Sequence, residues 1–143
     1  YKKQFPGIQQ YMDSMINFAR EHGYVQTLMG RKRWLRDINS SNFTVRGFAE
    51  RNAINSPIQG TAADMIKLAM QKVHAAMAKE KMQSKMLLQV YDELVFDVLK
   101  TEVKELKPLK PLIVENMQMA MPLPSDVPII AECGEGENWL EAH

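Results

Sequence analysis

The stretch "LLQVYDELVF", residues 87–96, places two apolar runs on either side of a Tyr-Asp-Glu triplet. Strand-length apolar runs that meet at a short polar break predict two neighbouring β-strands. We therefore interpret residues 86–90 and 94–99 as an antiparallel hairpin with its turn at Tyr91, Asp92 and Glu93. Tight turns usually take Asn or Gly, so two adjacent carboxylates at this turn make it a candidate functional site.

Helical and strand-like patterns alternate along the rest of the chain. We expect a helix after Pro6 that stops at Gly23, a hairpin over 24–34, a loop over 36–42, helices over 44–55 and from Pro57, a helix from Thr101 interrupted at Pro108 and Pro111, and a last strand over 127–134. This order predicts the α+β class, with an antiparallel sheet and a carboxylate-bearing hairpin packed against several helices.

The helix that is expected to begin at Pro57 has a regular apolar pattern. Its apolar stripe is expected to run from Ile58 through Ala62, Ile66, Ala69, Val73 and Ala76, with Asp64, Lys67, Gln71 and His74 on the opposite face.

Length and composition fit one globular domain or a compact piece of a longer one. The 143 residues are 45% hydrophobic and 24% charged, which is ordinary globular usage. Because the sequence opens at Tyr1 in what reads as the middle of an element, we expect a piece cut from a longer protein.

No apolar run approaches the roughly 20 residues of a membrane span, and no signal peptide is recognisable. The single cysteine, Cys133, excludes an internal disulfide and favours a reducing, cytoplasmic setting; we expect it to be buried in the last strand.

Charge is unevenly distributed along the chain. Residues 1–51 carry nine Lys/Arg against four Asp/Glu, whereas residues 52–143 carry nine against thirteen. A basic half beside an acidic half could present a polyanion-binding surface next to a metal-binding one. Solvated charges spread unevenly by chance would give the same numbers.

The acidic turn has the chemistry of a magnesium site. Mg²⁺ prefers hard oxygen ligands, and two-metal phosphoryl transfer needs carboxylates that bridge two ions. Asp92 is the candidate ligand and Glu93 a weaker, outer one. A solvated turn without any ligand is compatible with the same residues, and one turn alone does not supply the second, separate carboxylate.

Three long polar side chains recur at every fourth residue. Arg51, Asn55 and Gln59 would line one helix stripe, because each step of four residues rotates by only about 40°. A guanidinium and two amides can donate to the acceptors that every base pair presents in the minor groove. A solvated helix face is the alternative.

The tip of the first hairpin is strongly basic. Arg31, Lys32, Arg33 and Arg36 surround Trp34, which suggests a phosphate clamp with a stacking surface. A solvated basic turn with Trp34 packed inward explains the pattern equally well.

Taken in order, five segments resemble the C-terminal part of the family A DNA polymerases, the bacterial DNA polymerase I type. These are "FP" at 5–6, "GYVQTLMGRKRW" at 23–34, "AERNAINSPIQGTAADMIKLAM" at 49–70, "MLLQVYDELVF" at 86–96 and "GENWLEAH" at 136–143. The resemblance covers essentially the whole chain. It implies one fragment of a polymerase catalytic domain, with residues 1–56 mainly in the fingers and 57–143 mainly in the palm.

The resemblance also implies roles for the candidate residues. Asp92 would bind a pair of magnesium ions together with an Asp of another motif, and Glu93 would lie close by. The positions of Arg51, Asn55 and Gln59 would contact the template–primer duplex. The reaction would be template-directed addition of deoxynucleotides from deoxynucleoside triphosphates to a primer 3′ end.

Two departures from the family pattern matter. Tyr91 stands where the family usually has His, which puts the contact with the primer terminus in doubt. The first palm motif with the partner Asp, and the fingers helix that grips the triphosphate, are absent from these 143 residues. We therefore expect the fragment alone to be inactive, and an apolar face left bare at the cut could drive self-association.

Two other functions remain open. A non-catalytic duplex-binding module would keep the polar stripe, with Tyr91 marking lost chemistry. A magnesium-dependent nuclease would need a second clustered carboxylate, and Asp97 lies too far along the strand to serve.

Overall fold

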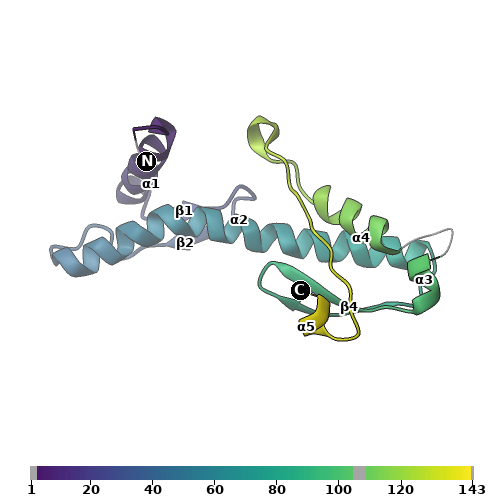
Figure 1. Cartoon of the computed structure of the whole chain (residues 1–143). Helices are drawn as coiled ribbons and strands as arrows, with labels where there is room; N and C mark the ends of the chain where they lie inside the picture. Colours follow the sequence, from purple (N-terminus) through teal and green to yellow (C-terminus); the bar gives the residue numbers. More distant parts are fainter. Residues whose placement is uncertain (1–2, 105–108, 143) are drawn as a thin grey trace. The chain divides into compact units, whose positions relative to one another are not determined.

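The structure is a computed structural model that describes residues 3–104 and 109–142. It consists of two compact units, residues 1–62 and 63–143, which are described separately below (Figure 1). Helix α2, Phe43–Lys79, contributes its first part to the first unit and its second part to the second. No helix within the described residues is long and apolar enough to cross a membrane.

The first unit combines a helix with a small hairpin. Helix α1, Pro6–His22, has Pro at its first position and ends at Gly23, whose φ of 81° is the left-handed geometry that glycine adopts freely. Strands β1, Tyr24–Gln26, and β2, Lys32–Trp34, pair antiparallel, as the sequence predicts. The buried core residues of this unit are Ala19, Val25, Leu35, Ile38, Ala49 and Ala53.

Helix α2 corrects the expectation that a new helix begins at Pro57. The helix runs through Pro57 without a break. Proline removes the N–H that would pair with the Ala53 carbonyl. Close by, Thr61 Oγ1 donates to the Pro57 carbonyl at 2.6 Å, and the Tyr11 hydroxyl donates to the Ile54 carbonyl at 2.9 Å. At its start, Asn42 Oδ1 accepts the first free N–H groups, as an N-cap does.

The apolar stripe along α2 is only partly as expected. Ala69 and Val73 are buried, but Ile58 is 59% exposed and Ala62 is exposed, whereas Asp64, expected on the opposite face, is buried. The reason is that α2 does not restart at Pro57. Its first part follows the phase of Ala49 and Ala53, and Ile58 lies off that face.

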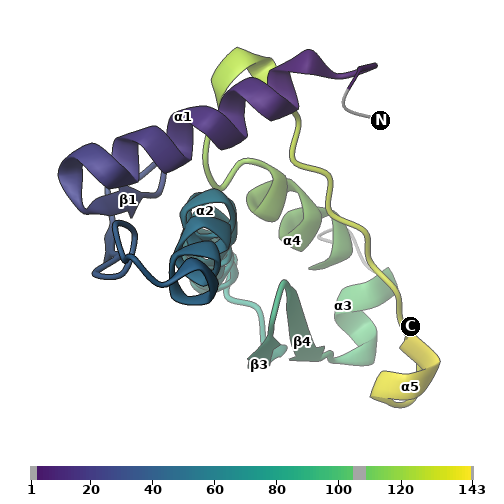
Figure 2. The ribbon, with the colours of Figure 1, turned by 90° about the vertical axis from the view of Figure 1, so that its left-hand side faces the viewer.

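The second unit contains the acidic hairpin. Strands β3, Lys85–Val90, and β4, Glu93–Asp97, pair antiparallel from Lys85↔Asp97 to Val90↔Glu93, with a bulge between Met86 and Leu88. The other elements are α3, Lys100–Lys104, α4, Leu109–Gln118, the 3₁₀ turn Pro124–Asp126 and α5, Trp139–Ala142. In this unit, α4 and the β3–β4 hairpin lie on different sides of α2 (Figures 1 and 2).

A core between α2 and α4 holds the second unit together. It consists of Val73, Met77, Leu109 and Ile113, with Met82, Phe96, Leu112 and Met117 packed against it. Lys72 Nζ adds a hydrogen bond of 2.6 Å to the Met119 carbonyl.

Two expectations for the second unit fail, and a third is only partly tested. Residues 127–134 form no strand; Pro128 lacks an N–H, and the Ala131 N–H donates to the Gln118 side chain at 3.1 Å instead of to a strand. Cys133 is consequently exposed rather than buried. Pro111 lies in the first turn of α4, where proline is tolerated, and Pro108 lies outside the described residues.

Candidate functional site

The acidic turn is a two-residue loop with strained backbone geometry. Val90 and Glu93 form the last pair of the ladder, which leaves Tyr91 and Asp92 as the loop. Tyr91 has φ of 54°, and the Gln89 side chain donates to its carbonyl. Two-residue hairpin loops require positive φ to match the strand twist, and a non-glycine residue pays about 1–2 kcal/mol for it. The loop is therefore held in one conformation by the strands on both sides.

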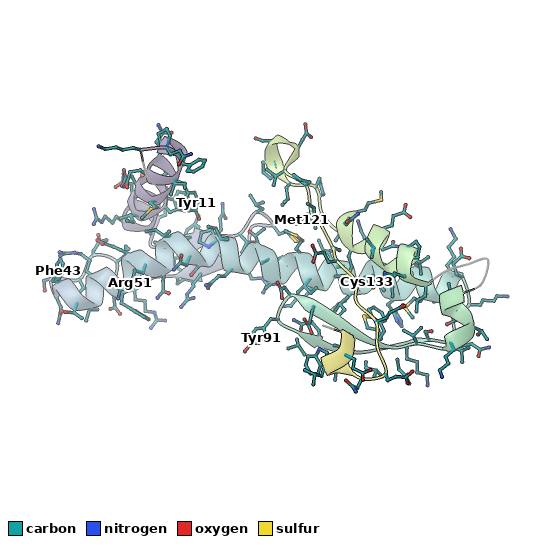
Figure 3. All side chains as sticks on the ribbon, viewed as in Figure 1. Tyr11, Phe43, Arg51, Tyr91, Met121 and Cys133 are labelled. Atoms are coloured by element: carbon teal, nitrogen blue, oxygen red, sulfur yellow. The ribbon has the colours of Figure 1, made fainter. Side chains whose placement is uncertain are left out.

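The side chains of the turn differ in their exposure. Tyr91 is 89% exposed and projects from the tip of the hairpin (Figure 3). Asp92 is exposed, whereas Glu93 is half-buried and its Oε1 accepts a hydrogen bond of 2.7 Å from the indole N–H of Trp139. One carboxylate is thus open to solvent, and its neighbour is tethered to α5.

The base of the hairpin is fixed by the carboxylate of Glu102, which lies in α3. Glu102 accepts hydrogen bonds of 2.8 Å from the backbone N–H groups of Gln83 and Ser84 and another from the Ser84 hydroxyl. The same hydroxyl accepts the Leu99 N–H at 2.9 Å. The Ser84 hydroxyl and the two N–H groups hold the pKa of Glu102 below its usual value. These bonds tie the end of β4 to the beginning of β3.

The acidic turn supplies donors of the right kind for magnesium, but an incomplete set. Mg²⁺ takes six hard oxygen ligands, and Asp92 offers an exposed carboxylate. Over residues 3–104 and 109–142, no three His, Cys, Asp or Glu side chains cluster closely enough to hold a metal ion. Asp92 therefore fits as one ligand of a site that needs further ligands.

In the first unit, the polar stripe of α2 is open to solvent. Arg51, Asn55 and Gln59 are all exposed. The Arg51 guanidinium lies 5.9 Å from the centre of the Phe48 ring, and Phe48 is itself exposed (Figure 3). A cation–π contact of this kind limits the freedom of the guanidinium.

The basic hairpin docks on α2 next to this stripe. The hydroxyl of Thr61 accepts the Leu28 N–H at 3.1 Å, and Arg33 Nη1 donates to Ser56 Oγ at 3.2 Å. Gly60 makes the close approach feasible, because a Cβ at this position would lie 2.5 Å from Thr27 Cγ2. The glycine in "QGT" is thus explained by contact between hairpin and helix.

A shallow pocket lies where the hairpin meets the helix. It has a volume of about 170 Å³ and is lined by Val25, Gln26, Thr27, Arg31, Lys32, Arg33, Ser56, Pro57, Gln59 and Gly60. The fold thereby brings Arg31, Arg33 and Gln59 to one pocket, although the sequence places them in separate motifs. Arg51 and Asn55 do not line it and lie further along α2 towards its N-terminus.

The environment of Trp34 excludes inward packing of its ring, whereas phosphate binding by the basic tip stays a prediction. Trp34 is 63% exposed, and its ring centre lies 5.0 Å from that of Tyr24. It is not packed into the core and leaves aromatic surface open beside Lys32, whose ammonium lies 4.5 Å from the centre of the Tyr24 ring.

Sequence reasoning missed several residues that hold these sites. Thr27, Ser56 and Thr61 are buried polar residues at the hairpin–helix contact, and Trp139 binds Glu93. A small-residue signal at Gly60 and Thr61 could have indicated close packing. No local signal links Trp139 to a residue 46 positions away.

Comparison with known proteins identifies the family. The model for DNA polymerase family A matches residues 1–141. Proteins named DNA polymerase I are similar over 99% of this chain: that of Streptococcus pneumoniae is 51% identical, that of Geobacillus stearothermophilus 45% and that of Bacillus subtilis 40%. The chain spans only 16% of the length of each of these relatives.

A solved structure agrees with the sequence relatives. The polymerase domain of Pol1 from M. smegmatis, in complex with DNA primer-template and dNTP, matches with a TM-score of 0.92 and 43% identity. The match covers 99% of this chain and 24% of that one. The chain therefore belongs to DNA polymerase family A.

Proposed function

We propose that this chain is the part of a DNA-directed DNA polymerase that carries the acidic turn and one face of the duplex-binding surface. The whole protein would add deoxynucleotides to a primer 3′ end as directed by a template. The main support is the 40–51% identity to DNA polymerase I over nearly the whole chain. Residues 1–56 would belong mainly to the fingers and 57–143 mainly to the palm; the division of the fold after residue 62 supports a boundary in this region.

Asp92 is proposed as the catalytic carboxylate and metal ligand. It is exposed on a turn whose backbone is held by two paired strands, and such rigidity suits a side chain that binds a metal directly. Magnesium ions at a two-metal site stabilise the attacking and leaving oxygens in phosphoryl transfer. Glu93 would lie beside Asp92 as an outer carboxylate.

The exposed donors of the first unit are proposed to hold the template–primer duplex. Arg51, Asn55 and Gln59 offer a guanidinium and two amides for minor-groove acceptors and backbone oxygens. Arg31 and Arg33 would neutralise phosphates at the edge of the same surface. Tyr91 can donate its phenolic O–H to DNA near the turn.

The 143 residues alone are proposed to be inactive in primer extension. The reason is that Asp92 needs further metal ligands, and within the described part of the chain no three His, Cys, Asp or Glu side chains form a group that could hold a metal ion. Exposed apolar side chains in the second unit, Leu87, Leu88, Ile130 and Leu140, are further proposed to make the isolated chain self-associate. Sedimentation velocity at increasing concentration tests this, and a monomer at every concentration would contradict it.

A chimera provides the test of function. This chain would replace the matching 142-residue segment of the Geobacillus stearothermophilus relative. We expect the chimera to extend a primer, and Asp92→Asn to lower kcat by about 10²–10³-fold or more, the range found for removal of one preorganised electrostatic group. The affinity for duplex DNA should stay close to that of the parent chimera.

Asp97→Asn is the matched control because Asp97 is an exposed carboxylate of the same hairpin, at the far end of β4. It should leave extension unchanged. Full activity of Asp92→Asn, or robust extension by the isolated 143-residue chain, would contradict the proposal.

A non-catalytic duplex-binding module is the second candidate. It is favoured by one observation, the Tyr at position 91 where the family usually has His. In that case the chimera would bind duplex DNA without extending a primer, and Tyr91→His would restore extension. If the chimera is active and Tyr91→His changes little, the module is excluded.

A further inference from the structure

We propose that Trp139 is a positioning residue that holds Glu93 away from the metal ligated by Asp92. This inference rests on the proposed function. The contact that carries it is the hydrogen bond of 2.7 Å from Trp139 Nε1 to Glu93 Oε1. The indole N–H is a donor only, and an ionised carboxylate is its strongest type of protein acceptor.

Trp139 is itself fixed by the fold of the segment 134–142, here called the cap segment. Asn138 Oδ1 accepts the Glu141 N–H at 2.9 Å, and its carbonyl accepts the Ala142 N–H at 3.1 Å. The Glu137 N–H donates in turn to Glu141 Oε2 at 3.0 Å. These bonds close the turn that presents the indole.

Two glycines allow the cap segment to fold back on itself. A Cβ at Gly134 would lie 1.9 Å from the Ala142 carbonyl oxygen, and one at Gly136 would lie 2.6 Å from Glu141 Cβ. The first of these contacts is with backbone, which cannot rotate away. The glycines in "CGEGENW" are therefore required for the position of Trp139.

Packing alone does not account for the contact. Trp139 is 45% exposed and belongs to neither buried core. Its indole N–H instead meets the carboxylate next to Asp92. The interaction restrains the half-buried Glu93 side chain, whereas Asp92 beside it is exposed.

The consequence concerns the number of carboxylates that reach the metal. Adjacent Asp and Glu side chains can both ligate one cation if both are free to turn. With one Glu93 oxygen bound to the indole, Asp92 is the direct ligand and Glu93 remains outside. Loss of the indole N–H removes this restraint on Glu93 and favours its approach to the cation, where a second anionic ligand strengthens binding of a divalent cation.

The test uses the chimera and measures the Mg²⁺ concentration at half-maximal primer extension. Trp139→Phe keeps an aromatic ring but removes the donor. We expect it to lower this midpoint by about two- to tenfold, the factor that corresponds to one net hydrogen bond. In a Glu93→Gln background, Trp139→Phe should have no such effect, because the anionic ligand is absent. Leu140→Ala, on the same short helix and 85% exposed, is the matched control and should leave the midpoint unchanged.

A second readout does not depend on activity. The indole N–H resonance of Trp139 in an NMR spectrum of the metal-free chimera should move when Glu93 is changed to Gln, whereas Asp97→Asn should leave it in place. This measurement stands even if Trp139→Phe fails to fold.

The outcomes separate this inference from the proposed function. An unchanged or raised Mg²⁺ midpoint in folded Trp139→Phe, or an indole resonance indifferent to Glu93→Gln, overturns the positioning role. Either result leaves the polymerase assignment intact as long as Asp92→Asn abolishes extension. If Asp92→Asn has no effect, the proposed function itself fails.

Discussion

Substitution of Gly60 by Ala tests whether the basic hairpin is docked on α2 as described. The new methyl group would lie 2.5 Å from Thr27 Cγ2, well inside normal contact. Thr27 cannot easily rotate away, because its Oγ1 accepts the N–H groups of Met29 and Arg31 at 3.2 and 3.3 Å. The overlap must therefore be relieved by a shift of the hairpin.

Gly47→Ala gives the reference for the magnitude. Both glycines lie inside α2, and both substitutions gain helix propensity of about 1 kcal/mol. At Gly47 the nearest atom, Arg51 Nη1, lies at an ordinary 3.6 Å. The difference in the free energy of unfolding between the two variants therefore isolates the overpacking, for which we expect about 1–3 kcal/mol.

The assay is urea unfolding followed by the fluorescence of Trp34, with Trp139→Phe in every variant so that one tryptophan remains. Thr27→Ser removes Cγ2 and keeps the hydroxyl, so it should restore most of the loss in the double variant. If Gly60→Ala stabilises the protein as much as Gly47→Ala does, the hairpin does not pack against α2 at this glycine. If Thr27→Ser gives no rescue, the clash is not with Cγ2.

Three further predictions concern single side chains. Tyr91→Gly should raise the free energy of unfolding by about 1 kcal/mol, because it relieves a φ of 54° at a side chain that is 89% exposed; a loss of stability in thermal unfolding would contradict this. The hydrogen bond from Ser84 is the main cause of the lowered pKa of Glu102. Ionised Glu102 therefore stabilises the folded state at pH values above its pKa in the unfolded chain, and this contribution is lost as pH falls through its pKa in the folded chain. Glu102→Gln should therefore flatten the pH dependence of stability as pH falls below the ordinary Glu pKa of about 4.3, and an unchanged slope in acid titration would refute it. Tyr11→Phe should lower the free energy of unfolding by about 1 kcal/mol, because the hydrogen bond to the Ile54 carbonyl is lost. Burial raises the pKa of Tyr11, so a spectrophotometric titration of this variant should lack the tyrosine with the raised pKa.

The sequence predicted the local elements well because their signals are local. Pro6 and Gly23 delimit α1, and the apolar runs around Asp92 delimit the second hairpin, as the structure confirms. Pro57 was misjudged because propensity treats proline as a helix start. In the folded chain the helix continues through Pro57; Thr61 donates to the carbonyl of this proline and Tyr11 to that of Ile54.

The contacts that shape the sites were out of reach of sequence reasoning. Gly60 meets Thr27, Ser84 meets Glu102 and Glu93 meets Trp139. Each pair joins distant positions, and no periodicity encodes such a pairing. The residues proposed to act were chosen from residue type and spacing, and their roles stay predictions, whereas the residues that contact them could not be predicted in this way.

The acidic hairpin unites these observations in one physical picture. At its base, Glu102 binds the turn before β3, and at its tip the strained φ of Tyr91 permits a two-residue loop. Beside the tip, Trp139 holds Glu93. Of the side chains at the turn, Asp92 and Tyr91 are therefore left exposed on a backbone with little freedom to move. The metal-ligand role proposed for Asp92 requires such a rigid backbone, because motion of even about 1 Å weakens a metal site; on that proposal, the strain at Tyr91 is the energetic cost of the rigid turn.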